Sequence, residues 1–252
     1  MKASESVKNY QSERRMYTNY AARGIKKVCK EIGPRFSGTE QEKKGIEYFS
    51  EELKTCCDEV KVDSYTVHPK AFLGWIPASG VLMIIAALAF FAGQFFGITP
   101  LLFVPVVFRI ICLFFGITEF VFYGETLDPF TPKKTSYNTY GIRKASGETK
   151  RRIIFSGHVD SSYEWTYTRL GGHVLLYICG VIAVVSLIFV LVSSILNTFG
   201  VLEEGTALYN IFHYGQFIGI PGGIIAIGFV NFKLCVEGAN DNLTGTVGSI
   251  AI

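Results

Sequence analysis

Long runs without charged residues limit what this chain can fold into. No Asp, Glu, Lys or Arg occurs in residues 71–108, 170–202 or 205–232, and only 18% of the 252 residues are charged, against about 25% in an average soluble domain. A helix needs roughly 20 apolar residues to cross the hydrocarbon core of a bilayer. A soluble protein would have to be much larger to cover so many apolar helices. The runs therefore predict an integral membrane protein.

Within these runs we predict four membrane-spanning helices. Their expected ranges are 73–96, 101–123, 174–198 and 207–231. The tight sequence at 97–100 joins the first pair, and the loop at 197–206 joins the second. The spans therefore form two helical hairpins, within residues 71–123 and 173–232. The sequence GIPGG at 219–223 predicts a kink or break in the fourth helix and would allow another helix to pack closely against it.

The other residues form three polar segments, 1–70, 124–172 and 233–252. Because each hairpin returns to the side from which it left, all three segments lie on one side of the membrane. They contain 14, 8 and 1 of the Lys and Arg residues, and the loops that join paired helices contain none. Cytoplasmic segments carry an excess of positive charge. We therefore expect the polar segments in the cytoplasm, attached to the cell membrane by the four spans.

The first polar segment begins with two predicted helices. Ala21, Ile25 and Val28 recur at helical spacing, and an Ile-Gly-Pro sequence at 32–34 then breaks the helix. A second helix is expected over Glu40–Leu53, because the Ser-Gly-Thr sequence before it supplies an N-cap.

Strand patterns follow in the first and second polar segments. Strict alternation over Glu59–Val67 predicts a half-buried strand. Residues 136–143 and 152–160 are expected as two further strands, joined as a hairpin by a turn around Gly147. In the third segment a helix is expected to begin near Thr244. Helices followed by strands with polar ends predict an α/β sandwich whose site lies at the strand ends, with both membrane hairpins inserted into one domain.

His158, Asp160 and Asp241 are the candidate site residues. A histidine at a strand end is fixed in space, and neutral imidazole is a good zinc ligand. A carboxylate two residues away can orient its ring, and the oxygens of Asp241, in a polar turn, can bridge two metal ions. The pattern alone leaves other roles open: His158 as a hydrogen-bonded strand-end histidine, and Asp241 as a helix cap.

Four sequences together resemble the twenty-eighth metallopeptidase family, the co-catalytic zinc peptidases that include bacterial leucyl aminopeptidases and aminopeptidase Y. They are IGPRFSGTEQEKKGIEYFSEELK, YNTYGIR, SGHVDS and GANDNLTG, and they occur in the family's order. The resemblance implies a zinc-exopeptidase-like three-layer α/β sandwich, here incomplete and interrupted by the two hairpins. It also implies two zinc ions and a peptide substrate, most simply cleaved by aminopeptidase activity, although the family includes carboxypeptidases and cyclases.

Residue by residue, the resemblance assigns His158 as a ligand of one zinc. Asp160 matches the catalytic-site carboxylate that orients the histidine, and Asp241 matches the aspartate that bridges both zinc ions. Asn242 and Gly245 belong to the same motif and are expected to shape the turn before the next helix. IGPRFSGTE is expected to be structural. The residues that bind the substrate are not identified by the sequence.

Two departures from the family pattern affect the expected function. His158 and Asp241 are 83 residues apart, because the second hairpin lies between them. The eleven residues after Asp241 contain no acidic residue or histidine, although the family takes its general base and remaining ligands from this region. We therefore expect an N-terminal fragment, inactive alone, divided as residues 1–70, 71–123, 124–172, 173–232 and 233–252.

Other interpretations remain open. A peptidase-like domain can serve as a non-catalytic interaction or receptor module, and Arg109 with the broken fourth helix is the support for a transporter-like protein. Arg109 is alternatively a structural residue that faces the interior of the helices or extends its charged end toward the outer surface. The adjacent Cys56 and Cys57 fit a reducing compartment, and we expect each of the six cysteines to be a small buried residue. The lipid bilayer is an expected partner, no pattern indicates nucleic-acid binding, and the oligomeric state stays open.

Overall fold

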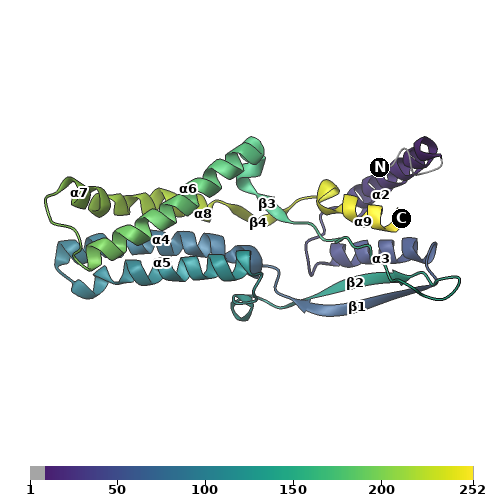
Figure 1. Ribbon diagram of the computed structural model, residues 1–252, viewed down its shortest axis with the longest axis horizontal. Helices are drawn as coiled ribbons and strands as arrows, with labels where there is room; N and C mark the ends of the chain where they lie inside the picture. Colours follow the sequence, from purple (N-terminus) through teal and green to yellow (C-terminus); the bar gives the residue numbers. More distant parts are fainter. Residues whose placement is uncertain (1–8, 252) are drawn as a thin grey trace. The chain divides into compact units, whose positions relative to one another are not determined.

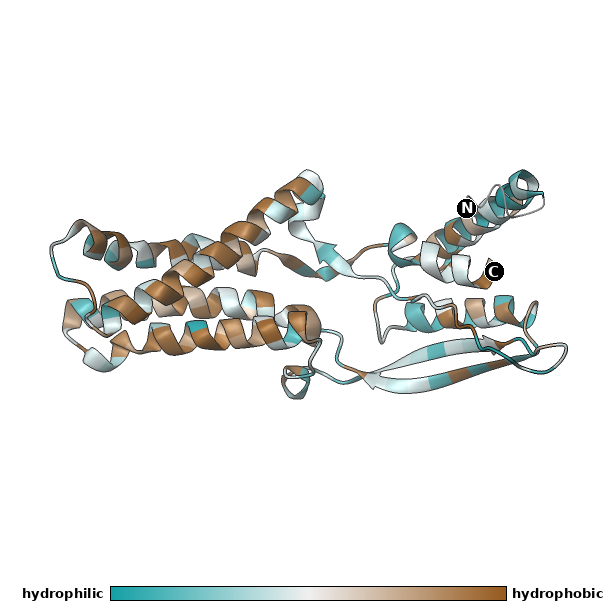
Figure 2. Ribbon diagram, viewed as in Figure 1, coloured by the Kyte–Doolittle hydropathy of each residue, from teal (hydrophilic) through white to brown (hydrophobic). Residues whose placement is uncertain are grey.

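The computed structural model describes residues 9–251 and separates the chain into two units. Unit 1 consists of Met1–Pro69, Lys133–Tyr163 and Lys233–Ile252, and unit 2 consists of Lys70–Pro132 and Glu164–Phe232. Hydrophobic residues dominate the helices of unit 2, whereas polar residues dominate the two long helices of unit 1 (Figure 2). Each unit therefore has its own chemical character.

Unit 1 begins with helices α2 (Tyr10–Glu31) and α3 (Glu40–Lys54), as the sequence predicts. Thr39 is the N-cap of α3, because its side chain accepts a hydrogen bond from the backbone N–H of Glu42 at 3.3 Å. Glu42 in turn accepts from the backbone N–H of Gly38 at 2.7 Å. The two hydrogen bonds satisfy one backbone donor in the first turn of α3 and one just before the N-cap.

The sheet of unit 1 has two antiparallel strands, β1 (Glu59–Val67) and β2 (Lys134–Ile142), with Glu59 opposite Ile142 (Figure 1). Helix α3 packs against β2. The predicted hairpin between β2 and residues 152–160 is wrong. Residues 143–162 form neither helix nor strand, and β2 pairs instead with β1, a strand of the same length. The side chains of Ile153 and Ile154 are consequently 73% and 81% exposed.

The core of unit 1 joins residues that are far apart in the sequence. Its buried members are Val28, Ile46, Phe49, Val159, Leu243 and Val247. They come from α2, from α3, from residues 143–162, which we call the irregular segment, and from the C-terminal stretch. In that stretch η5 (Ala239–Leu243) precedes helix α9 (Thr244–Ala251). Full burial of such a side chain stabilises a fold by about 1.5–3 kcal/mol. This core fixes the backbone on both sides of the candidate site.

Unit 2 contains three helices that are long and apolar enough to cross a membrane. The first is α4 (Ala71–Phe96) and the third is α6 (Thr166–Thr198). The second, Thr99–Val121, is made of η1 (Thr99–Leu102), α5 (Val104–Phe115) and the π-helix η2 (Gly116–Val121). The first three predicted spans lie on these helices.

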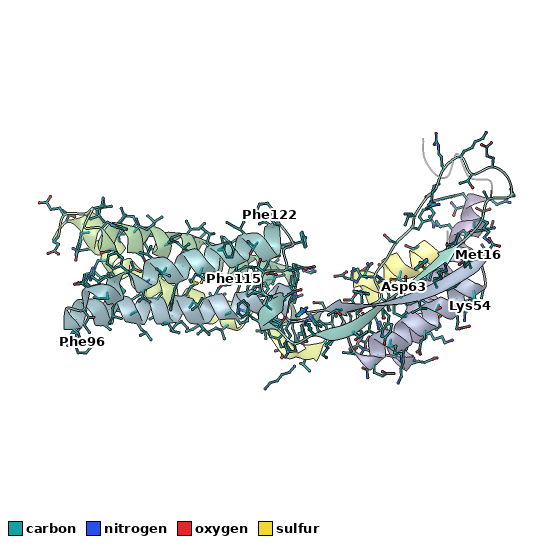
Figure 3. The ribbon with its side chains drawn as sticks, turned by 90° about the horizontal axis from the view of Figure 1, so that it is seen from below. Met16, Lys54, Asp63, Phe96, Phe115 and Phe122 are labelled. Atoms are coloured by element: carbon teal, nitrogen blue, oxygen red, sulfur yellow. The ribbon has the colours of Figure 1, made fainter. Side chains whose placement is uncertain are left out.

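The exposed side chains of these helices are largely apolar. Phe96 ends α4 and Phe122 follows η2, and they lie at opposite ends of unit 2 (Figure 3). They are 67% and 74% exposed, respectively. Apolar side chains of this size on a helix surface are compatible with contact to lipid.

The fourth predicted span is not one helix. It consists of α7 (Ala207–Tyr214), η4 (Gly215–Ile218) and α8 (Gly219–Ile227), and strand β4 (Val230–Cys235) begins where the span was expected to end. β4 pairs with the short strand β3 (Tyr163–Trp165). Four membrane spans therefore remain a prediction. The segment is interrupted at residues 215–218, before the expected position, and the GIPGG sequence itself lies within helix α8.

Glycines bring α4 and α8 close together. A Cβ atom on Gly80 would lie 2.5 Å from the carbonyl oxygen of Gly223, and a Cβ on Gly223 would lie 2.6 Å from that of Gly80. Gly222 similarly approaches Ser186 of α6, at 2.8 Å from the serine Cβ. Small residues at such crossings are how helices pack closely in lipid. The close packing expected from GIPGG is thus observed.

All six cysteines are free thiols. Cys112 and Cys179 are buried, as expected, but Cys56 is exposed in the turn after α3. The prediction of a buried residue is therefore wrong for Cys56, because the helix ends at Lys54 and the next residues face outward.

Candidate metal site

The irregular segment places His158 and Asp160 side by side. Val159, between them, is only 6% exposed and packs into the core of unit 1. Successive side chains of an extended backbone point to opposite sides, so the buried valine directs its two neighbours outward. Nδ1 of His158 lies 2.9 Å from Oδ1 of Asp160. In the tautomer with its proton on Nδ1, the ring donates to this carboxylate, and the lone pair of Nε2 is then available to a ligand.

Asp241 comes from the last of the three sequence stretches of unit 1, Lys233–Ile252, and faces the same histidine. Its Oδ1 lies 3.6 Å from Nε2 of His158. Gly238 has a φ of 62° and turns the chain into η5, and the buried Leu243 anchors the segment on the far side of Asp241. The structure therefore brings together all three predicted site residues, although His158 and Asp241 are separated by the second apolar segment.

The start of α9 holds the histidine backbone. The hydroxyl of Thr246 donates to the carbonyl oxygen of His158 at 2.7 Å. Gly157 lies so close to α9 that a Cβ atom there would be 2.5 Å from the backbone nitrogen of Thr246. Asn242 folds its amide oxygen over Gly245, where any Cβ atom would clash with it. The motif residues Asn242 and Gly245 thus shape the turn and helix start, as the resemblance implies.

Arg35 is a site residue that the sequence did not single out. Its guanidinium is completely buried and donates to three backbone carbonyls: Nε to Val159 at 3.0 Å, Nη1 to Gly33 at 2.5 Å and Nη2 to Glu237 at 2.8 Å. Burial lowers the pKa of Arg35, but a guanidinium remains charged in proteins. The signal available in the sequence was an arginine within the IGPRFSGTE resemblance, where it was expected to be structural.

The separation of the His158 and Asp241 side chains can be compared with the spacing of ligands in a zinc site. Ligand atoms at neighbouring corners of a tetrahedral zinc site are about 3.4 Å apart, given Zn–N and Zn–O distances of about 2.0–2.2 Å. The 3.6 Å between Nε2 of His158 and Oδ1 of Asp241 is close to this value. Asp160 stands where a carboxylate orients a metal-bound histidine. These residues fit two ligands and an orienting group.

The same residues do not complete a metal site. Within residues 9–251, no group of three or more His, Cys, Asp or Glu side chains is arranged to hold a metal ion. The His158 and Asp241 side chains are also open to solvent, at 56% and 85% exposure. A zinc site at this position would need additional ligands.

Unit 2 contains a separate buried polar cluster around Arg109. Nη1 of Arg109 donates to the carbonyl oxygen of Val190 at 2.7 Å and also contacts Ser194 Oγ and Gln216 Oε1. The side chain is fully buried, so it faces the interior of unit 2, as one of the open interpretations expected, and it does not extend to the surface. Nε and Nη2 of Arg109 have no hydrogen-bond partner among the described residues.

Comparison with known proteins adds no relative. No family model, no curated protein and no solved structure matches this chain.

Proposed function

We propose that this chain is part of a membrane-anchored, zinc-dependent exopeptidase, most simply an aminopeptidase. The observation that carries the proposal is the arrangement of His158 between two carboxylates, with Nδ1 2.9 Å from Asp160 and Nε2 3.6 Å from Asp241. The three residues occupy the positions that the metallopeptidase resemblance assigns to a ligand, its orienting group and a bridging ligand. Peptide substrates with a free terminus are the class of substrate proposed.

Each side chain has a separate role in this proposal. Asp160 fixes the orientation of the His158 ring through Nδ1, and His158 and Asp241 present a nitrogen and an oxygen atom toward one position. Zinc bound there would polarise the peptide carbonyl and activate water. Catalysis would also need a general base and further ligands, and residues 9–251 hold no group of three or more ligand side chains. The chain alone is therefore proposed to be inactive.

The finer fold assignment belongs to the same proposal. Unit 1 would form part of a three-layer zinc-exopeptidase-like sandwich, and the segments of unit 2 would be two membrane hairpins inserted into it. The three separate stretches of sequence that make up unit 1 support this interpretation.

Zinc binding by the whole chain in detergent micelles tests the proposed function. We expect one Zn²⁺ to bind, and we expect His158→Ala and Asp241→Asn each to weaken binding at least tenfold, because each removes one of two ligands. His173→Ala is a matched control, since His173 lies in the apolar segment of unit 2. Equal zinc affinity in the wild type and both site variants would reject the site.

A non-catalytic peptidase-like module of a membrane protein is the alternative. It is favoured by the exposure of His158 and Asp241 and by the absence of a third ligand within residues 9–251. The full reading frame separates the two functions. Additional glutamate, aspartate and histidine ligands downstream would support the enzyme, whereas a continuation without them, together with no zinc binding, would support the alternative.

The proposed cytoplasmic location of unit 1 is tested by labelling. A cysteine that replaces Glu203, between α6 and α7, should react with an impermeant maleimide on intact cells. The exposed Cys56 of unit 1 is an internal control, because it should react only after the membrane is permeabilised. The reverse pattern would place unit 1 outside the cell.

A further inference from the structure

We propose that Arg35 is a positioning residue that sets the separation of His158 and Asp241. The metal-binding part of this inference rests on the proposed zinc site, whereas the alignment of the two loops can be measured without metal. Arg35 would act through backbone atoms and would not touch the metal or the substrate.

The side chain of Arg35 connects the two segments that carry the ligands. Its Nε donates to the carbonyl of Val159, the residue between His158 and Asp160. Its Nη2 donates to the carbonyl of Glu237, four residues before Asp241. One rigid, planar group therefore contacts the backbone of both ligand segments, and the distance between those segments depends on its dimensions.

The backbone of Arg35 adds a second connection to the histidine segment. The N–H of Arg35 donates to Ser161 Oγ at 2.9 Å, and the N–H of Ser161 donates to the carbonyl of Arg35 at 2.9 Å. Gly238 fits between these groups: a Cβ atom there would lie 2.7 Å from the Ser161 Cβ and 3.3 Å from Nη2 of Arg35. The Asp241 segment is thus packed directly against the Arg35–Ser161 pair.

Arginine is suited to this role for a geometric reason. Its guanidinium presents N–H groups in several fixed directions, whereas a lysine ammonium is a single point on a flexible stem. A lysine at this position keeps the positive charge but cannot reach the carbonyls of Gly33, Val159 and Glu237 in the same way. Lysine and methionine variants therefore separate geometry from charge.

Electrostatics and positioning predict opposite results for zinc affinity. A buried cation near a metal site repels Zn²⁺, so removal of the charge in Arg35→Met should tighten binding if charge were the main effect. If Arg35 positions the ligands, Arg35→Lys and Arg35→Met should both weaken zinc binding, by about 10–100-fold, as for other residues that orient metal ligands. Unchanged affinity in Arg35→Lys, or tighter binding in Arg35→Met, would overturn the proposal.

Hydrogen–deuterium exchange of the metal-free chain provides an independent measurement. In Arg35→Lys we expect faster exchange in both ligand segments, 158–161 and 236–243, where the amides of Ser161 and Leu243 are hydrogen-bonded. Arg23→Lys is the matched control, because Arg23 is exposed and donates to Asn19 in its own helix. Wild-type protection of both segments in Arg35→Lys would overturn the inference.

The two measurements also distinguish failure of this inference from failure of the proposed function. If the wild-type chain binds no zinc, the proposed zinc site fails, and the exchange experiment alone decides the role of Arg35. If the wild type binds zinc through His158 and Asp241 but Arg35→Lys changes neither affinity nor exchange, the inference on Arg35 fails alone. If Arg35→Met unfolds unit 1, the lysine variant decides.

Discussion

Unit 1 buries Arg35 and unit 2 buries Arg109, and both side chains are completely inaccessible to solvent. The two guanidinium groups are nevertheless held in different ways. Arg35 uses Nε, Nη1 and Nη2, each directed at a different backbone carbonyl. Arg109 directs only Nη1 at its acceptors, and its Nε and Nη2 have no partner within the described residues.

The difference shows how much the surrounding structure depends on each arginine. The carbonyls of Val159 and Glu237 belong to irregular segments, so they rely on Arg35 for a buried donor. The acceptors of Arg109 have other partners: Ser194 Oγ already donates to the carbonyl of Val190, and Ser194 and Gln216 lie within 3.4 Å of each other. We infer that Arg35 is structurally essential, whereas Arg109 is a buried charge that its neighbours can do without.

The same substitution at both positions tests this comparison and has the largest expected effect. Arg35→Met should lower the free energy of unfolding of unit 1 by about 3–5 kcal/mol, because it leaves the buried carbonyl of Val159 and the partly buried carbonyls of Gly33 and Glu237 without this donor. Arg109→Met should change the stability of unit 2 by less than about 1 kcal/mol, or increase it, because replacing an uncompensated buried charge by an apolar residue is often neutral or favourable.

The two units can be followed separately in this experiment. Both tryptophans, Trp75 and Trp165, lie in unit 2, so their fluorescence reports its unfolding. Hydrogen exchange of α2 and α3 reports the unfolding of unit 1. A loss of several kcal/mol in Arg109→Met would contradict the comparison and would indicate that Arg109 has a counter-charge or a functional ligand.

A second prediction concerns the glycines of unit 2. Gly80→Ala should destabilise unit 2 by about 1–3 kcal/mol, because a Cβ atom 2.5 Å from the carbonyl oxygen of Gly223 forces α4 and α8 apart. Gly74→Ala is the control in the same helix, since no atom lies within 4 Å of the position that its Cβ would occupy. It should be neutral or slightly stabilising, because alanine favours helix more than glycine does. Equal thermal stability of the two variants in micelles would show that the close approach of α4 and α8 is not required.

Local sequence patterns predicted much of the secondary structure. The strand at Glu59–Val67 and the helix from Glu40 depend on alternation and capping, which involve only neighbouring residues. The strand is not half-buried as expected, because none of its residues is buried. The three long apolar helices follow from composition alone. The strand expected at 152–160 failed because its formation needs a partner, and pairing is a non-local property that the sequence of one segment does not contain.

The candidate site was predictable to a smaller extent. His158 and Asp160 are two residues apart, so an extended backbone places them on one side. Asp241 could be linked to them only through the metallopeptidase resemblance, because 83 residues intervene. Arg35 carries no local signal that separates it from an exposed arginine such as Arg23. Its role becomes evident only when three distant carbonyls are seen around one side chain.

The smallest expected effect concerns a buried acid of unit 1, Glu42, whose carboxylate is held by the N–H of Gly38 and the hydroxyl of Ser136 at 2.7 and 2.5 Å. Burial raises the pKa of Glu42 despite these hydrogen bonds, which act in the opposite direction. A carboxyl whose pKa is higher in the folded state contributes stability that is full below its unfolded pKa of about 4.3 and is lost as the pH rises through the folded value.

The stability of the wild type relative to Glu42→Gln should therefore decrease as the pH rises from about 4 to 7, because glutamine does not titrate. Hydrogen exchange of α3, measured across this range, gives the difference, and Glu40→Gln, an exposed change in the same turn, controls for net charge. A difference that grows with pH would show that the two hydrogen bonds outweigh burial. Hydrogen bonds would then stabilise both buried charges of unit 1, Glu42 and Arg35. Arg109 of unit 2 would differ from both, because its Nε and Nη2 have no partner among the described residues.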